Sequence, residues 1–268
     1  MSFCSGVKMT DRAEIYHTEQ LIERLTVVID IKSTGSNARD VIVAIGICAT
    51  SPDRKHVYKY RVGIKLRSDE EIAMMNKDQM SWSDLWVRKG YDLRCFDRFW
   101  KSRLDKLDKI QNGTYIRLVK SNRELAFEIN RILKEIEERC KTVDIVTNTT
   151  NFDTVQVGRI LADEQLQPLH YSRDGVYRWT YHSKSYLLGL WGGDIATMTD
   201  EHWKAFGEWV VRKIDKINPY PIRCDRLNPE DDALFIGSQW ANANKYASRK
   251  MEKRMAKASA KAASSSST

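Results

Sequence analysis

Residues 26–35 read TVVIDIKSTG, and this stretch decides how the rest of the chain is interpreted. Its first six residues are mostly β-branched and apolar apart from Asp30, a composition typical of a buried strand. A polar break follows, and a second apolar run, VIVAIGICA, lies at 41–49. A Ser-Pro-Asp turn at 51–53 leads to a third run, at 56–66, in which apolar and polar residues alternate. Two strand–turn–strand connections in succession predict an antiparallel meander at the start of a sheet.

Helical patterns surround this predicted meander. Residues 11–25 predict a helix, with Asp11 as its N-cap and Glu14 three residues later. The order of predicted strands and helices indicates an α/β fold, a mixed sheet flanked by helices. The other predicted elements are a strand at 143–148 and helices at 122–141, about 153–163, 184–190, 200–217 and from about Pro229 into the tail. The expected parts are a helical extension at 1–23, one main domain at 24–244 and a basic tail at 245–268.

The segment 77–110 is rich in aromatic residues among many charges. Short helices that pack these rings into a cluster are the favoured interpretation, because buried aromatic side chains remove large apolar areas from water. A surface on which nucleic-acid bases stack is the alternative. The rings are those of Trp82, Trp86, Tyr91, Phe96, Phe99 and Trp100.

The composition is that of a globular protein with enough apolar material for a core, since 42% of the 268 residues are hydrophobic and 30% are charged. No apolar run reaches the roughly 20 residues that cross a bilayer, and the first residues lack the apolar core of a secretory signal. The five cysteines are scattered and never form a C-x-x-C pair, which argues against a disulfide framework or a zinc site. We expect an intracellular protein, cytoplasmic or nuclear, without membrane contact.

Positive charge is concentrated at the C-terminal end. Of the net charge of +8, the tail at 245–268 carries +6, from seven basic residues and Glu252. Ala, Lys, Arg and Met are good helix formers, so the basic part can extend the last helix. Such an arm predicts contacts with the phosphates of DNA or RNA, and a solvated terminus is the alternative. The cationic positions are Lys245, Arg249, Lys250, Lys253, Arg254, Lys257 and Lys261.

Acidic residues stand at the ends of several predicted elements. Asp30 ends the first strand, Asp153 follows the strand at 143–148, and Asp231 and Asp232 open the last helix. Carboxylates brought together from distant segments repel one another unless cations lie between them. Two-metal phosphodiester hydrolysis uses such an arrangement, with hard oxygen ligands that suit Mg²⁺ or Mn²⁺. Taken singly, each aspartate is better explained as an N-cap or a turn residue.

The ordered set resembles the DEDD-type 3′–5′ exonuclease superfamily, which has a ribonuclease H-like fold. The family's first motif, Asp-x-Glu-Thr-Thr-Gly followed by an Asp-x-Ile-x-x-Ile-Gly strand, is similar to residues 30–35 and 40–46. The second motif, Asn-x-x-x-Phe-Asp, is similar to residues 148–153, and the third ends in the Asp-Asp-Ala of 231–233. The resemblance covers about residues 24–243. The irregular spacers and the tryptophan-rich segment are more similar to viral or phage members than to cellular ones.

This resemblance implies a ribonuclease H-like mixed sheet and a site that meets the 3′ end of DNA or RNA. It implies that Asp30, Asp153 and Asp232 are catalytic and that they hold Mg²⁺ or Mn²⁺ if the protein is active. The residues expected to contact nucleic acid are Lys32, Ser33, Thr34, Gly35, Asn148 and Phe152 near the site and Lys250, Lys253 and Arg254 in the tail.

Two departures from the family pattern bear on activity. The family's metal-bridging glutamate falls on Lys32, which changes the charge there from −1 to +1 and should weaken metal binding severely. The ammonium could pair with Asp30 and Asp153 and cushion a phosphate, or form a plain salt bridge. The family's general base, a His five residues or a Tyr four residues before the last Asp, falls on Leu227 or Asn228. Neither side chain deprotonates water, so we expect weak or absent catalysis.

Three functions are compatible with this pattern. The favoured one is an exonuclease-fold protein that binds nucleic acid with impaired catalysis. The alternatives are an active metal-dependent 3′–5′ exonuclease with a divergent site and a structural or interaction protein that retains the fold. His170, His182 and His202 lie between the second and third motifs, and one of them could reach the site, although a structural role explains each better. The oligomeric state stays open.

Overall fold

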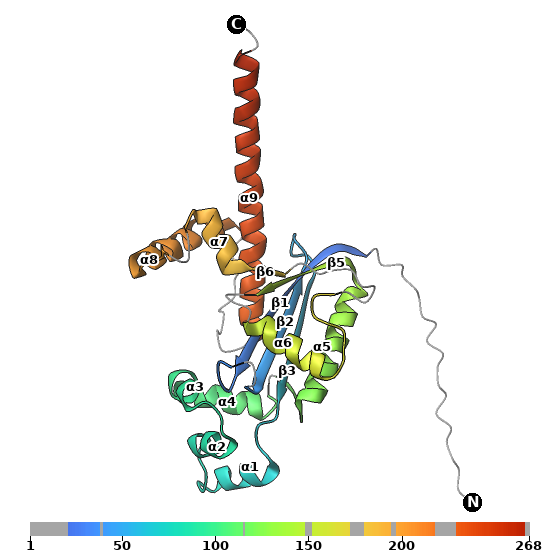
Figure 1. The fold of residues 1–268 in the computed structure, drawn as a ribbon, viewed down its shortest axis with the longest axis vertical. Coiled ribbons are helices and arrows are strands. Elements are labelled where there is room, and N and C mark those ends of the chain that lie inside the picture. The colour runs from blue at the N-terminus through green and yellow to red at the C-terminus, as the bar shows by residue number, and fades with distance from the viewer. Residues whose placement is uncertain are drawn as a thin grey trace, which may run out of the picture.

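A six-stranded mixed sheet forms the centre of the protein, in the order β4-β3-β2-β1-β5-β6 (Figure 1). The structure is a computed structural model, and it describes residues 21–37, 40–114, 116–147, 152–171, 180–193, 197–217 and 229–265. The strands are β1 (Ile22–Ser33), β2 (Ile42–Thr50), β3 (Val57–Ile64), β4 (Arg117–Val119), β5 (Cys140–Thr147) and β6 (Thr180–His182).

The first three strands form the predicted meander, because β1 pairs antiparallel with β2 and β2 pairs antiparallel with β3. The chain then crosses over, so that β5 lies parallel to β1 and β6 lies parallel to β5. The short strand β4 adds to β3 in parallel at the other edge. The predicted α/β class, a mixed sheet flanked by helices, is confirmed.

Helices cover both faces of the sheet, which explains why the centre of β1, residues 27–29, is apolar on both faces. Val27 and Ile29 pack into a core with α5 (Asn122–Glu137) and α6 (Phe152–Asp163). Val28, on the opposite face, packs against the start of α9 (Pro229–Ser265). Successive side chains of a strand point to opposite faces, so both sets are fully buried.

The aromatic segment folds into short helices, as predicted, and its rings form a core. Trp86 and Trp100 are 0% and 1% exposed, and Trp82 and Phe96 are also buried. The Trp86 ring centroid lies 5.1 Å from that of Phe96 and 6.0 Å from that of Trp82. The packing interpretation is therefore confirmed over the stacking surface for these four rings. The elements are α1 (Asp69–Asn76), α2 (Trp82–Lys89), α3 (Leu93–Cys95), the π-helical turn η1 (Phe96–Trp100), the 3₁₀ turn η2 (Lys101–Arg103) and α4 (Leu104–Gln111).

The C-terminal part packs helices around α9. A small core with Leu187, Phe206 and Ile214 joins them to Ala243 of α9. Helix α9 continues well beyond the body (Figure 1), so the predicted helical extension into the tail is confirmed. No helix in the described part of the chain is long and apolar enough to cross a membrane. The other elements here are α7 (Ser183–Trp191), α8 (Asp200–Trp209), the π-helical turn η4 (Val210–Ile214) and the 3₁₀ turn η5 (Asp215–Ile217).

The predicted ends of two helices were wrong. The helix predicted at 11–25 does not include its last residues, because β1 begins at Ile22, whose backbone pairs with Cys140 of β5. Residues 1–20 lie outside the described residues. The division at residues 1–23, 24–244 and 245–268 stays a prediction; residue 23 lies in β1 and residue 244 lies in α9. The predicted helix at 122–141 ends at Glu137, since β5 begins at Cys140.

Candidate functional site

Two charged residues of β1 face the first turn of α9. Asp30 and Lys32 are two residues apart, so they share the face of β1 on which Val28 packs against α9. Asp232 lies in the first turn of α9, which starts at Pro229. The fold therefore brings together residues that are 200 positions apart in the sequence.

Lys32 forms two short ion pairs with carboxylates. Its Nζ lies 2.7 Å from Oδ2 of Asp30 and 2.7 Å from Oδ2 of Asp232. The side chains are only 10% exposed for Lys32, 11% for Asp30 and 17% for Asp232. One ammonium is thus shared between two carboxylates in a largely water-free place, where charge-assisted hydrogen bonds are strong.

Asp153 joins this cluster through the backbone of β1. Strand β1 extends past the end of β5 at Thr147, and Asp153, at the start of α6, accepts a hydrogen bond from the Ile31 backbone N–H at 3.2 Å. The sequence interpretation paired Lys32 with Asp30 and Asp153. The structure corrects the second partner, because Lys32 bonds to Asp232 and Asp153 bonds to the Ile31 amide.

Burial controls the titration of this cluster. Desolvation raises the pKa of Asp30 to about 7, although the neighbouring Lys32 ammonium opposes the rise. Desolvation also raises the pKa of Asp153 to about 6, against the Ile31 hydrogen bond. Burial by itself lowers the pKa of Lys32, but the carboxylates of Asp30 and Asp232 outweigh it and raise that pKa above the usual value. Lys32 is therefore charged at neutral pH.

The loop after β1 is stabilised by hydrogen bonds within the loop and by hydrogen bonds from other segments. Thr34 is fully buried, and its Oγ1 accepts a hydrogen bond from the Val41 backbone N–H at 3.1 Å. The Ser33 hydroxyl donates to the Gly35 carbonyl, and the Ser33 carbonyl accepts from Trp100 Nε1 at 2.9 Å. These contacts give Ser33 and Thr34 a role in shaping the loop, and leave little of their surface for the nucleic-acid contact that was predicted.

Two supports of this loop were missed from the sequence. Trp100 comes from the aromatic segment, whose composition indicated a core or a stacking surface and no support for this loop. Gln156 of α6 is fully buried, and its Nε2 donates to the Asn37 carbonyl at 2.5 Å. A polar residue among apolar positions of a predicted helix was the available signal, but it does not reveal the partner.

The other predicted contact residues are scattered. Phe152 is half-buried and packs against the core beneath α6. On α9, Lys250 is half-buried, and Lys253 and Arg254 are exposed. Asn148, and Leu227 and Asn228 where the family's general base would fall, lie outside the described residues.

None of the histidines considered from the sequence is seen to join the cluster in the described part of the chain. The neighbour of His182, Tyr181, packs against α9, so His182 points to the other face of the sheet, and its Nδ1 lies 3.2 Å from Thr147 Oγ1. His170 contacts a hydroxyl of β6, and His202 completes a capping box at the start of α8. These contacts fit the structural role that was favoured for each.

Comparisons with known proteins concern the fold. No protein-family model matches the chain, and no curated protein matches it. A solved structure of product-bound exonuclease I is 11% identical with a TM-score of 0.45, and the match covers 83% of this chain and 43% of that one. A full-length 3′-exonuclease is 10% identical with a TM-score of 0.44, over 82% of this chain and 81% of that one. This chain thus spans less than half of the exonuclease I chain, and identities this low say nothing of what it binds or cuts.

The groups in the cluster do not fit a pair of divalent cations. Lys32 presents three hydrogen-bond donors and no lone pair, whereas Mg²⁺ and Mn²⁺ need oxygen ligands. Among the described residues, no group of three or more His, Cys, Asp or Glu side chains is arranged to hold a metal ion. Two aspartates expected to hold metal instead bind Lys32, and the third binds a backbone amide.

Proposed function

We propose that this protein binds DNA or RNA through a nuclease-like fold and does not cut it. The observation that carries the proposal is the position of Lys32, whose ammonium lies 2.7 Å from the carboxylates of Asp30 and Asp232. In the resembling family, this position belongs to a glutamate that binds metal. Here a fixed protein cation neutralises the carboxylates.

Charge balance explains why a metal would compete poorly. The ammonium occupies one oxygen of Asp30 and one of Asp232, and its like charge repels a divalent cation. At about 4 Å and an effective dielectric of about 20, each unit of charge on the cation meets about 4 kcal/mol of repulsion. Without a metal, water lacks the activation that two-metal hydrolysis requires. The cluster therefore supports a stable fold and not hydrolysis.

Helix α9 supplies a surface suited to phosphates. At about 100° per residue, its cationic positions from 245 to 257 fall within one half of the helix circumference. Met251 and Met255, both 64% exposed, fall in the other half. A continuous cationic face binds the nucleic-acid backbone without reading sequence. Helix α9 extends beyond the body of the protein (Figure 1), which leaves this part of the helix accessible.

A second candidate is an active metal-dependent 3′–5′ exonuclease, favoured by the convergence of Asp30 and Asp232 near Asp153. This candidate requires Lys32 to leave the cluster when metal and substrate bind. The two candidates differ in one observable, which is metal-dependent shortening of a bound strand.

The test combines binding and cleavage on the same material. Single-stranded DNA, duplex DNA and single-stranded RNA, each labelled at the 3′ end, are incubated with the full chain in Mg²⁺, in Mn²⁺ or in a chelator. We expect a shift on native gels for at least one of these nucleic acids and an intact label on denaturing gels in every condition. Metal-dependent loss of label by the wild-type protein would establish the second candidate, and the absence of any shift would overturn binding.

Four variants control for contamination and for residual function. Lys32→Glu, alone and with Leu227→His, restores the charge and the base that the family pattern contains. Lys101→Glu makes the same charge change on an exposed helical turn that is remote in sequence from the cluster. Loss of label that Asp30→Asn abolishes and Lys101→Glu retains would come from the cluster, whereas loss that Asp30→Asn retains would come from a copurifying nuclease.

A further inference from the structure

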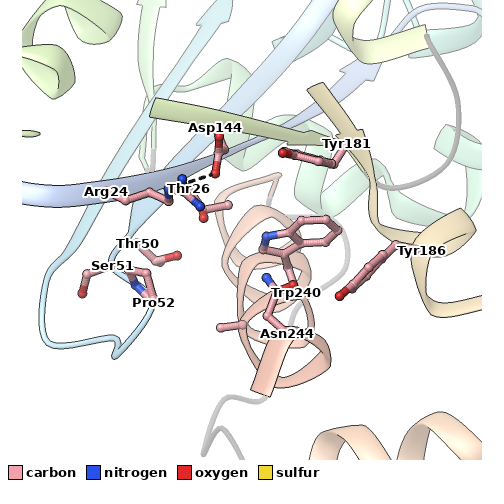
Figure 2. A pocket seen from close by; sticks show the side chains of 11 residues that line it. Arg24, Thr26, Thr50, Ser51, Pro52, Asp144, Tyr181, Tyr186, Trp240 and Asn244 are labelled. Carbon is pink, nitrogen blue, oxygen red and sulfur yellow. Dashed lines mark ion pairs between the residues drawn. The ribbon is translucent and has the colours of Figure 1, made fainter. Parts of the chain in front are cut away.

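A cavity of about 430 Å³ lies beside α9, on the same face of the sheet as the Lys32 cluster (Figure 2). Trp240 lies eight residues after Asp232 on α9, which at about 1.5 Å per residue places it about 12 Å farther along the helix. The cavity is therefore separate from the Lys32 cluster. The residues that argue for a ligand are Arg24 and Thr26 of β1, Asp144 of β5, Tyr181 of β6, Tyr186 of α7 and Trp240.

A buried carboxylate stands in the wall of this cavity. Asp144 occupies an apolar strand, is 8% exposed as a residue, and its side chain is 11% exposed. Within the described part of the chain no hydrogen bond reaches its carboxylate. Its ion pair with Arg24 measures 3.5 Å from Nε to Oδ2, longer than the roughly 3 Å of a hydrogen bond. Desolvation raises the pKa of Asp144. The long ion pair with Arg24 leaves this nearly buried carboxylate short of donors, so the position fits a ligand that supplies them.

The aromatic residues beside it form a wall. Figure 2 shows Trp240 with Tyr181 and Tyr186 next to it. Their ring centroids lie 5.1 Å and 4.7 Å from that of Trp240, at interplanar angles of 38° and 48°. Rings this close leave no space between Trp240 and either tyrosine, so a ligand packs against the open side of the wall. A flat ring packed against the wall is the ligand shape that suits it.

We propose that this cavity binds a guanine base. The edge of guanine carries two adjacent donors, N1–H and the 2-amino group, which match the two oxygens of the Asp144 carboxylate. The neighbouring O6 is an acceptor, and an arginine guanidinium is its common partner. Arg24 already lies beside Asp144, so the pair presents donor next to acceptor, as the guanine edge requires. Adenine and cytosine offer a single amino group there and leave one carboxylate oxygen unpaired.

The sugar and phosphate have a way out of the cavity at Arg24. The Arg24 side chain is 57% exposed and also lines an adjoining cavity of about 580 Å³, together with Ser51 and Pro52. The guanine can therefore belong to a free nucleotide or to a strand held by the protein. The inference uses none of the residues of the Lys32 cluster, so it stands or fails independently of the proposed function.

The test measures binding of guanosine 5′-monophosphate to the full chain by isothermal titration calorimetry. Inosine 5′-monophosphate, which lacks only the 2-amino donor, should bind about tenfold more weakly or worse, as expected for a lost hydrogen bond to a charged group. Adenosine 5′-monophosphate should bind more weakly still. Asp144→Asn should remove the preference for guanosine over inosine, and Asp105→Asn, an exposed position on α4, should leave it unchanged.

A second arm distinguishes the strand from the free nucleotide. Oligothymidine with one guanosine is compared with the same strand carrying inosine there. A preference for guanosine that Asp144→Asn loses supports the proposal. The arm in which the preference is found shows whether the guanine belongs to a free nucleotide or to a strand. Asp144→Asn is not used if it melts at a lower temperature than the wild type. In that case Arg24→Met, at the exposed rim of the cavity, is tested in its place, and it should weaken guanosine binding at least severalfold. Equal binding of guanosine and inosine in both arms, or an unchanged preference in the variants, would overturn it.

Discussion

Replacing Lys32 by methionine tests how strongly the fold depends on the shared ammonium. Methionine keeps the unbranched apolar stem of lysine as far as Cε and removes the charged amine. The carboxylates of Asp30 and Asp232 then face each other with 11% and 17% side-chain exposure and without a counter-ion. A buried carboxylate that loses its partner is strongly destabilising.

The expected magnitude follows from the two 2.7 Å contacts. At an effective dielectric of about 20, each contact is worth about 6 kcal/mol before desolvation is subtracted. The net loss expected from removing one member of a buried ion pair is about 3–5 kcal/mol, and we expect this range at about pH 8. At about pH 5 the Asp30 carboxyl is neutral, because its pKa is raised to about 7 by burial. Only the contact with Asp232 is then lost, so the destabilisation should fall to about half.

Urea unfolding followed by circular dichroism at both pH values measures these losses. Lys101→Met is the matched control, because Lys101 also pairs with a carboxylate, that of Asp97 at 3.1 Å, but is 68% exposed. It should change the free energy of unfolding by less than about 1 kcal/mol. The reasoning would be refuted if Lys32→Met matched Lys101→Met at the higher pH, or lost the same free energy at both pH values.

Three further predictions concern the cluster, its loop and α9. The pKa of Asp30 is about 7 in the folded state and 3.8 in the unfolded state, so ionisation of this group lowers the free energy of unfolding of the wild type by about 4 kcal/mol as pH rises from about 4 to 8. Asp30→Asn should therefore make the free energy of unfolding less dependent on pH in this range. The same dependence in the variant as in the wild type, measured by urea unfolding, would contradict this. Trp100→Phe removes the donor to the Ser33 carbonyl and should cost about 1 kcal/mol or more, whereas a variant as stable as wild type would show that the bond does not hold the loop. Glutamine at three exposed cations of α9 should lower the log–log salt slope of nucleic-acid binding by about 2 to 3, and the same slope as wild type would exclude α9 from the contact. The three positions are Lys253, Arg254 and Lys257.

The sheet was predictable from the sequence where the local residue pattern indicates the same conformation as the strand pairing in the fold. The apolar runs of β1 and β2 are buried on both faces, so their composition alone indicates strands. The start of β1 was not predictable, because residues 22–25 fit a helical pattern equally well. Their conformation is set by pairing with Cys140 to Val143 of β5, which lie more than a hundred residues away and leave no local signal.

The site was predictable only as a set of positions. The motifs placed Asp30, Lys32 and Asp232 at meeting element ends, and the structure brings them into contact. Which carboxylates pair with the Lys32 ammonium depends on where α9 starts relative to β1. The spacing of the motifs in the sequence does not reveal that position. The Asp144 cavity was beyond the sequence as well, since its lining comes from four strands, a turn and two helices. An aspartate in an apolar strand was its one local sign.

Calorimetric titration of Mn²⁺ into the full chain tests the central claim, that Lys32 takes the place of a metal ion. We expect no saturable binding to the wild type at micromolar Mn²⁺, because the ammonium holds both carboxylates and repels the cation. Lys32→Glu, which supplies an oxygen ligand and removes the ammonium, should gain at least one site. Micromolar binding of two Mn²⁺ ions by the wild type, with Lys32 in place, would contradict the claim.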